Sequence, residues 1–397
     1  MKKIFPALAA ALTTAFAMGC GSDHTPLEPP PHQSQTLTVL GNGQVQDRFT
    51  GEIWVQGNVA YTTTWGNRGV PGNAVKIWDV SGDVPLLVDS LIVPNAVTLG
   101  DVQVSDDGQL LVVATEFSPG SIMLYSLANP RQPQLVTRYT TALTDPGVHT
   151  ANVARVDGRL YAFLCIDNSS TAAARLVIVD ITDPTTPTQV FTQIMGSPYV
   201  HDTFVRDGIL FTAVWNDGIK IWDIGGGGRG GTPSNPIQLS TLPTGGQAHN
   251  VWWYKSASGE KRFAFVGQEG PGSVGSSSSG DIHVIDVADL SAPREVAVYH
   301  INGAGTHNFW VDETRGILYA AYYNGGVRAI DITGDLSTCD ASSRDFFGRC
   351  DLGQMGREVA HGLLDGPPVY VWGIQIAGGQ LYASDMLNGI WKLSLVP

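Results

Sequence analysis

The sequence predicts an all-β fold, a seven-bladed β-propeller of four-stranded antiparallel blades, on three observations. A short apolar strand that ends in Asp recurs along the chain, and Leu176–Asp180 (LVIVD) is its plainest copy. The copies are separated by several tens of residues, a spacing typical of propeller blades. Between them, short apolar runs alternate with Gly, Asp-Gly and Pro clusters, whereas segments with helical periodicity are hard to find.

The recurring strand is expected to be the third strand of each blade. Its other copies are Val75–Asp79, Gly218–Asp223, Ile282–Asp286, Gly326–Asp331 and Gly389–Leu393, with a degenerate copy at Ser121–Tyr125. An Asp that follows a strand readily accepts hydrogen bonds from nearby backbone N–H groups. We therefore expect the acid at the end of each copy to cap the turn that follows. These acids are Asp79, Asp180, Asp223, Asp286 and Asp331.

The other strands of the repeat can be placed around this one. A first strand precedes a turn such as Asp157-Gly158, which favours a tight hairpin, and an aromatic-rich second strand follows. Aligned first strands begin at Gly51, Gly100, His149, His201, His249, His307 and Trp372. The last repeat holds only three strands, so we expect the segment 35–40 to supply its fourth strand and close the ring, which would pair an open sheet edge.

The chain resembles a known family at several of these motifs. Leu176–Asp180, the Pro-x-x-Pro turns and the run Asp385–Trp391 are similar to those of bacterial LVIVD-repeat proteins. The resemblance covers residues 45–396 and implies a β-propeller. It implies no defined activity.

The beginning of the chain is predicted to direct export. Residues 1–19 read as a lipoprotein signal peptide, with Lys2 and Lys3 before an apolar run that is too short to span a membrane. Because Ala17–Cys20 resembles a lipobox, Cys20 is expected to carry a lipid that anchors the protein in a membrane of the bacterial cell envelope, on its periplasmic or cell-surface side. The alternative is ordinary signal cleavage. Residues 20–34 then form a Pro-rich tether, and residues 35–397 form the propeller.

Charge and cysteine content add two expectations. The formal net charge of −13 disfavours nucleic acid, which needs clustered Lys and Arg, and favours a cation or a basic partner. Cys165 lies in an apolar run and is expected to be a buried thiol. In an exported protein, Cys339 and Cys350 are expected to form a disulfide.

The aligned first strands predict a candidate site at one mouth of the central channel. Their starts form a ring on one face, joined by residues that follow the second strands. The residues predicted to bind a ligand there are His149, His201, His249, His307, Glu52, Asp101, Asp202, Trp215, Tyr323 and Asp385. Two interpretations of the four histidines remain open. They could hold a transition metal such as Fe, Zn or Cu, or they could be structural and polar lining that the repeat carries by duplication.

Two functions follow from these interpretations. The first is a lipid-anchored propeller that binds a small molecule or a protein, or serves as a scaffold, through a mouth of histidines, acids and aromatics. The second is a metal-dependent enzyme, an oxidoreductase, that uses the ring of histidines. A nucleophilic triad is not supported, because no Gly-x-Ser-x-Gly elbow occurs in the sequence. Catalytic residues and oligomeric state are not predicted.

Overall fold

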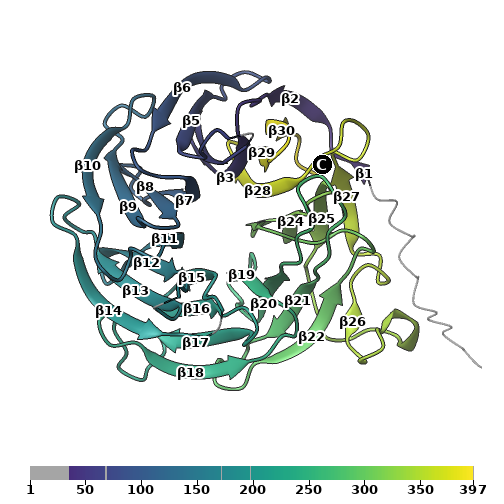
Figure 1. Ribbon diagram of the computed structural model, residues 1–397. Helices are drawn as coiled ribbons and strands as arrows, with labels where there is room; N and C mark the ends of the chain where they lie inside the picture. The colour runs from purple at the N-terminus through teal and green to yellow at the C-terminus, as the bar shows by residue number, and fades with distance from the viewer. Residues whose placement is uncertain (1–34, 68, 171, 197, 397) are drawn as a thin grey trace, which may run out of the picture. The chain divides into compact units, whose positions relative to one another are not determined.

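Seven antiparallel β-sheets surround a central channel (Figure 1). The computed structural model describes residues 35–67, 69–170, 172–196 and 198–396, which lie in one unit of the chain, His32–Pro397. The predicted signal peptide and tether, with Cys20, fall outside these residues. Within them, the one helix is the single 3₁₀ turn η1 (Ala341–Ser343), and no helix could cross a membrane. The predicted all-β, seven-bladed propeller is confirmed.

Each blade places its first strand at the channel and its last strand at the periphery. Blades one to three comprise β3 (Phe49–Gln56), β4 (Val59–Trp65), β5 (Ala74–Asp79), β6 (Leu86–Ile92), β7 (Thr98–Val104), β8 (Leu110–Glu116), β9 (Ser121–Ser126), β10 (Gln134–Tyr139), β11 (Val148–Val156), β12 (Arg159–Ile166), β13 (Arg175–Asp180) and β14 (Thr188–Ile194).

The remaining four blades follow the same order. Blades four and five comprise β15 (Asp202–Arg206), β16 (Ile209–Ala213), β17 (Ile219–Asp223), β18 (Ile237–Leu242), β19 (Ala248–Trp253), β20 (Phe263–Gln268), β21 (Ile282–Asp286) and β22 (Arg294–Tyr299). Blades six and seven comprise β23 (Phe309–Asp312), β24 (Ile317–Ala321), β25 (Val327–Asp331), β27 (Glu358–Gly362), β28 (Val371–Ala377), β29 (Gln380–Asp385), β30 (Gly389–Leu393) and β2 (Val39–Gly43).

The position of a strand in its blade explains its sequence. Second strands such as β8 are buried at every residue, because both faces pack on neighbouring blades, and they read as continuous apolar runs. Outer strands such as β6 are mostly exposed. The hydrophobic core consists of clusters between adjacent blades, for example Tyr61 and Ile77 of blade one with Leu99 and Val113 of blade two. Each blade therefore depends on its two neighbours for burial.

The ring is closed by a strand from the start of the chain, as predicted, but the strand lies later than expected. β2 pairs antiparallel with β30, and its register joins Val39 to Leu393 and Gly43 to Ile390. Residues 35–40 were expected to fill this place. Instead, β1 (Gln35–Thr36) pairs parallel with β27 as a fifth strand of blade six. The chain crosses from one blade to the next between β1 and β2, which the apolar pattern does not reveal.

The Asp that ends the third strand caps the next turn, as the sequence predicts. In five blades its Oδ1 accepts a hydrogen bond from the backbone N–H two residues later. The N–O distances are 3.0 Å at Asp79, 3.0 Å at Asp180, 2.9 Å at Asp223, 3.1 Å at Asp286 and 2.8 Å at Asp331. The role of this recurring acid is therefore structural, and it lies at the end of the blade opposite the channel mouth.

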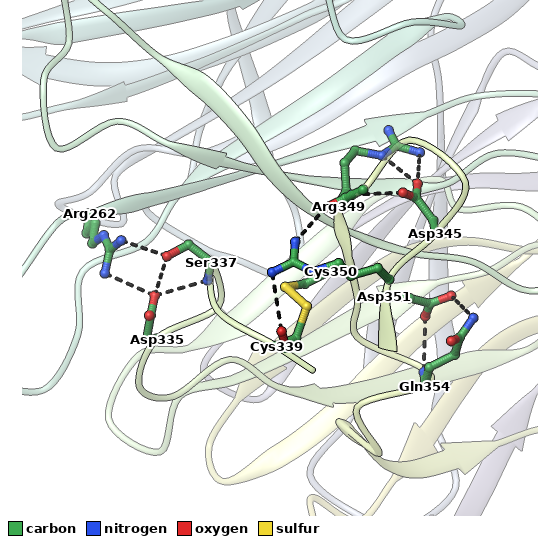
Figure 2. Close-up of a disulfide and its surroundings, with 11 residues drawn as sticks. Arg262, Asp335, Ser337, Cys339, Asp345, Arg349, Cys350, Asp351 and Gln354 are labelled. Atoms are coloured by element: carbon green, nitrogen blue, oxygen red, sulfur yellow. Dashed lines mark hydrogen bonds and ion pairs between the residues drawn. A yellow bond between two sulfur atoms is a disulfide. The ribbon is translucent and has the colours of Figure 1, made fainter. Parts of the chain in front are cut away.

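Blade six carries the predicted disulfide, which Figure 2 shows. Cys339 and Cys350 are bonded, with their Cα atoms 5.8 Å apart. The bond closes a loop from which β26 (Cys350–Asp351) adds a parallel fifth strand to blade five. Arg349 binds Asp345 within this loop (Figure 2). Cys165 is a buried free thiol, as expected.

Three tryptophans lie in the central channel and not in the core between blades. The rings of Trp54, Trp252 and Trp310 meet there. The ring centroids of Trp252 and Trp310 are 5.4 Å apart. They lie on first strands, where alternate side chains point into the channel. The bulky side chains narrow the channel on the far side of the histidines.

The closing strand gives the first prediction. A Cβ on Gly41 of β2 would lie 2.4 Å from the backbone oxygen of Asp83, so we expect Gly41→Ala to push β2 away from blade one. Overpacking of this kind costs roughly 1–3 kcal/mol, and the freed edge of β30 should promote aggregation. Chemical denaturation and light scattering check both effects. Gly82→Ala is the matched control, because its Cβ would meet nothing within 4 Å; equal stability of the two variants would contradict this account of closure.

Candidate functional site

The first strands change register where they reach the channel mouth. In blade three the pairing of β11 with β12 shifts between Val148 and Thr150, and in blade five the pairing of β19 with β20 shifts between Ala248 and Asn250. The residues left out of register are His149 and His249. A β-bulge of this kind re-aims the side chain of the extra residue. The bulges therefore turn these imidazoles into the channel mouth.

Four histidines stand side by side along the mouth. The ring centroids of His149 and His201 are 4.1 Å apart, as are those of His201 and His249 and those of His249 and His307. The ring of Trp372, which holds the same position in blade seven, lies 4.0 Å from His307. The histidines were expected to share one rim, and they form a continuous row of contacting rings there.

Several imidazole nitrogens in this row have no ordinary partner. Nε2 of His149 and Nε2 of His201 are 2.7 Å apart, so one donates and the other accepts. His307 Nδ1 lies 2.7 Å from the carbonyl oxygen of Trp372, to which it donates. In contrast, Nδ1 of His201 and both nitrogens of His249 are buried and form no hydrogen bond within the described residues. Such buried unpaired groups are costly, so they indicate a missing partner.

Buried carboxylates face the row of histidines. Glu116 Oε1 lies 3.3 Å from His149 Nδ1, and Asp167 Oδ1 lies 3.6 Å from the same nitrogen. Glu269 Oε2 lies 3.4 Å from His201 Nε2 and 3.8 Å from His249 Nε2. These three acids follow the second strands of blades two, three and five, the position that converges on the mouth. The mouth therefore combines nitrogen and oxygen ligand atoms.

A second group of acids lies one residue further along the first strands. Glu52, Asp101 and Asp202 line the small space beneath the histidines. Asn308 donates to Glu52, and the backbone N–H of Ala151 donates to Asp101 at 3.1 Å. Together with Glu116, Asp167 and Glu269, they make six carboxyl groups around one channel mouth. In the described chain, four of these six carboxyl groups lie within 4 Å of a histidine nitrogen, and none of the six forms an ion pair with Lys or Arg.

Burial shifts the protonation of both kinds of residue toward the neutral form. It lowers the pKa of His149 to about 4, and burial with the nearby histidines lowers the pKa of His201, His249 and His307 well below the usual value. At neutral pH these imidazoles are uncharged, and each keeps a lone pair that can bind a metal ion.

The carboxyl groups shift in the opposite direction. Burial raises the pKa of Asp167 and of Glu269 to about 7. Burial and the charges of Asp167 and Asp101 raise the pKa of Glu116 well above its usual value. Burial, with the charge of Asp101, also raises the pKa of Glu52 and Asp202. Ionising these carboxyl groups in the folded protein therefore costs free energy.

The mouth has room for a ligand at two depths. The deeper space, about 30 Å³, lies among the four histidines, Glu52, Asp101, Glu116 and Asp202, and its volume is that of one or two water molecules. The outer hollow is about 240 Å³. Its walls are Trp65, His149, Tyr199, His201, Trp215, Glu269 and Trp372. An ion fits the deeper space, and a small organic group fits the hollow.

Two aromatic residues at the mouth adopt a strained backbone. Trp215 has φ 41° and Tyr323 has φ 44°, in the left-handed region that bulky residues avoid. Each follows the second strand of its blade, and each is held by a backbone bridge to the next blade, Trp215 to Ala248 and Tyr323 to Val371. Strain of this kind concentrates at functional sites, where surrounding structure maintains it. Here it directs both rings toward the histidines, since Trp215 stacks on His201 and Tyr323 contacts His307.

The structure brings together most of the residues predicted for the site. His149, His201, His249, His307, Glu52, Asp101 and Asp202 line the deeper space, and Trp215 lines the hollow. Tyr323 lies behind them and donates a hydrogen bond to Glu269. Asp385 is placed differently. Its carboxylate is fully buried and accepts hydrogen bonds from the N–H groups of Tyr370, Leu387 and Trp391, which gives it a structural role in blade seven.

The structure adds residues that were not among the predicted ligands. Glu116, Asp167, Glu269 and Trp65 share the position after the second strand, and this position is a signal that could have ranked them with Trp215. Trp372 lies at the start of the first strand of blade seven, the position that the histidines hold in blades three to six. Tyr199 precedes β15 in an irregular segment, and no sequence pattern indicates its place in the hollow.

Comparison with known proteins supports the repeat. Residues 171–193 match the family model described as the LVIVD repeat. This segment contains β13 and most of β14 of blade three, so the chain carries an LVIVD repeat within a seven-bladed propeller, as its motifs predicted. Comparison with curated proteins gives no significant match.

The shifted acids predict how stability depends on pH in the absence of a bound cation. At pH 7 and above, most copies of each mouth histidine are neutral in the unfolded chain as well as in the folded chain. A carboxyl with a raised pKa, such as Asp167 at about 7, still holds its proton in the folded state alone. The folded state therefore binds more protons, and stability should fall as the pH rises through about 7.

Asp167→Asn tests this dependence. Because it removes a charge that is costly to bury, we expect it to raise the free energy of unfolding by roughly 2–4 kcal/mol at pH 8 and to change it much less at pH 5. Denaturant unfolding at both pH values in chelated buffer provides the measurement. The exposed Asp365→Asn serves as the control. A gain that is the same at both pH values would count against buried charge as the cause.

Proposed function

We propose that the propeller is a binding module that takes up a cation at its channel mouth. A β-propeller of repeats suits binding in general. One observation supports a cation as the ligand. Six carboxyl groups converge on the mouth, and within the described chain none of them forms an ion pair with Lys or Arg; their neighbours are neutral histidines. A bound cation would supply the missing positive charge.

The energetics of burial support this proposal. Desolvating a carboxylate without a charged partner is expensive, and grouping several of them adds repulsion. When these carboxyl groups are ionised and no cation is bound, they destabilise the folded protein. A cation that binds among them would stabilise it. The net charge of −13 would raise the local concentration of cations further.

The hollow above the acids supports a ligand larger than a single ion. Trp65 and Trp372 approach to 5.0 Å between ring centroids, and Tyr199 and Trp215 approach to 5.2 Å. Aromatic faces next to carboxylates also suit organic ammonium groups. A metal ion and an organic amine therefore share the same attraction to this mouth, and experiment can separate them.

Cation binding is tested by thermal unfolding with a panel of cations. The panel contains Ca²⁺, Zn²⁺ and tetramethylammonium, with choline as a larger amine. We expect at least one of them to raise the melting temperature, because a cation present at 100 times its Kd adds about 2.7 kcal/mol.

Glu116→Gln should weaken this stabilisation, because it removes one charge of the mouth. The matched control is Glu260→Gln at an exposed position, which should respond as the unchanged protein does. If no cation of the panel raises the melting temperature, or if Glu260→Gln and Glu116→Gln reduce the response equally, the proposed function is wrong.

We also propose that the protein is exported and held in the bacterial cell envelope by a lipid on Cys20. The support is the basic start, the short apolar run and the Ala17–Cys20 lipobox. Anchoring would leave the propeller at the end of a Pro-rich tether, where its mouth could meet ligands outside the cytoplasm.

Cys20→Ala tests the anchor. The unchanged protein should sediment with membranes and partition into detergent, whereas Cys20→Ala should lose both properties, because a lipidated residue is removed. Cys165→Ala is the control, since Cys165 is buried in the propeller. Recovery of Cys20→Ala with the membrane fraction in the same proportion as the control would exclude the lipid anchor.

A further inference from the structure

One side of the row of histidines holds three ligand atoms close together. A nitrogen of His201, a nitrogen of His249 and a carboxylate oxygen of Glu269 all lie within 4.8 Å of one another, and all three side chains are buried. They come from blades four and five, so one blade interface holds the whole set. The other carboxyl groups of the mouth do not gather two imidazoles in this way within the described chain.

The separations match those of ligands on one metal ion. Two ligand atoms that each lie about 2.1 Å from a tetrahedral ion are about 3.4 Å apart. Glu269 Oε2 lies 3.4 Å from His201 Nε2 and 3.8 Å from His249 Nε2. The third separation, between nitrogens of His201 and His249, is at most 4.8 Å, so side-chain rotation would have to bring these two atoms closer together around a shared ion.

The unpaired nitrogens provide a second and independent indication. His249 is 2% exposed, and neither of its nitrogens has a hydrogen-bond partner within the described residues. Burying two nitrogens without partners removes them from water with no hydrogen bond in return, which destabilises the folded state. A metal ion on one of them would offset much of this cost.

Glu269 is oriented from behind by Tyr323. The Tyr323 hydroxyl donates to Glu269 Oε1 at 2.5 Å, which leaves Oε2 directed at the histidines. Outer hydrogen bonds of this kind hold metal ligands in place and increase affinity. The left-handed backbone of Tyr323, at φ 44°, is the strain that this positioning requires.

We propose that His201, His249 and Glu269 bind one first-row transition-metal ion, of the Zn²⁺ or Fe²⁺ class, with coordination positions left open toward the aromatic hollow. This inference rests on the proposed cation-binding mouth and names its ligand. Two imidazoles disfavour Ca²⁺ and Mg²⁺, which prefer oxygen ligands. Two histidines with one carboxylate are also a set that leaves sites for an exogenous ligand.

The open side determines what such a metal could do. His201 and Glu269 also line the hollow of about 240 Å³, beside Trp65, Tyr199, Trp215 and Trp372. A small molecule with an aromatic or apolar body and an oxygen or nitrogen donor could place its donor on the metal and its body against these rings. A metal ion on His201 Nε2 would displace the hydrogen bond between this atom and His149 Nε2, which now lie 2.7 Å apart. His149 also lines the hollow, and its freed nitrogen could accept a proton from such a ligand.

The experiment measures metal affinity on the full chain. After chelation and dialysis, the protein is titrated with Zn²⁺ by calorimetry, and with Co²⁺ by visible absorption, which reports nitrogen and oxygen ligation directly. We expect one ion per chain. His249→Ala should weaken binding by more than about 100-fold, since it removes a ligand, and Tyr323→Phe should weaken binding by roughly 10- to 100-fold, as losses of outer partners do.

His300→Ala is the matched control, because His300 pairs with Asp281 on the surface, away from the mouth. It should bind as the unchanged protein does. Circular dichroism establishes that each variant is folded, and Glu269→Gln replaces His249→Ala if the latter fails to fold.

Three outcomes would overturn the inference. They are the absence of stoichiometric Zn²⁺ or Co²⁺ binding by the unchanged chain, equal affinity in folded His249→Ala or Glu269→Gln, and equal weakening in His300→Ala. If Ca²⁺ or an organic ammonium still stabilises the protein, the proposal of a cation-binding mouth stands and only the assignment of a transition metal is wrong. If no cation binds, both fail.

Discussion

The packing of one blade against the next is the constraint on which the rest of this structure depends. A blade of four short strands cannot bury both of its faces alone, so its second and third strands are apolar on both sides. Tyr61 and Phe211 pack against the following blade, and Leu164 packs against the preceding one. This packing fixes the register of every first strand at the channel, and the same register brings the mouth side chains together.

The stability of the packed blades allows the channel mouth to hold side chains and backbone in arrangements that cost free energy. Imidazoles without partners, carboxyl groups without basic neighbours and left-handed backbone at Trp215 and Tyr323 each cost free energy. All of these features occur together at the channel mouth. A bound cation would relieve the charge and the unpaired nitrogens together, so one ligand explains several separate costs.

Much of this arrangement could be predicted from the sequence. The LVIVD strands and the Asp-Gly turns set the blade number, and the aligned starts placed His149, His201, His249 and His307 on one rim. The predictions for Asp385 and for the closing strand were wrong because both depend on local contacts that a repeat pattern does not encode. Asp385 follows a second strand like Glu269, yet its neighbours supply three N–H donors and turn it into a structural cap. The closing strand is Val39–Gly43 and not residues 35–40, because Gln35 and Thr36 pair with blade six.

The selection of ligands among the histidines also lay beyond the sequence. Equivalent positions in the repeat suggested four equivalent residues, but the structure distinguishes them by their partners. His307 donates to a carbonyl oxygen and His149 faces two acids, whereas neither nitrogen of His249 forms a hydrogen bond within the described chain. The partner of each nitrogen depends on bulges and on residues from other blades, and these are set only when the ring closes.

A crystal structure of the protein grown with Zn²⁺, with anomalous diffraction recorded on both sides of the zinc absorption edge, tests the central claim most directly. The account predicts one anomalous peak at the channel mouth, about 2.0–2.2 Å from a nitrogen of His201, a nitrogen of His249 and Oε2 of Glu269. A fully occupied structure with no peak at the mouth, or with zinc bound only at surface residues such as His300, would contradict it.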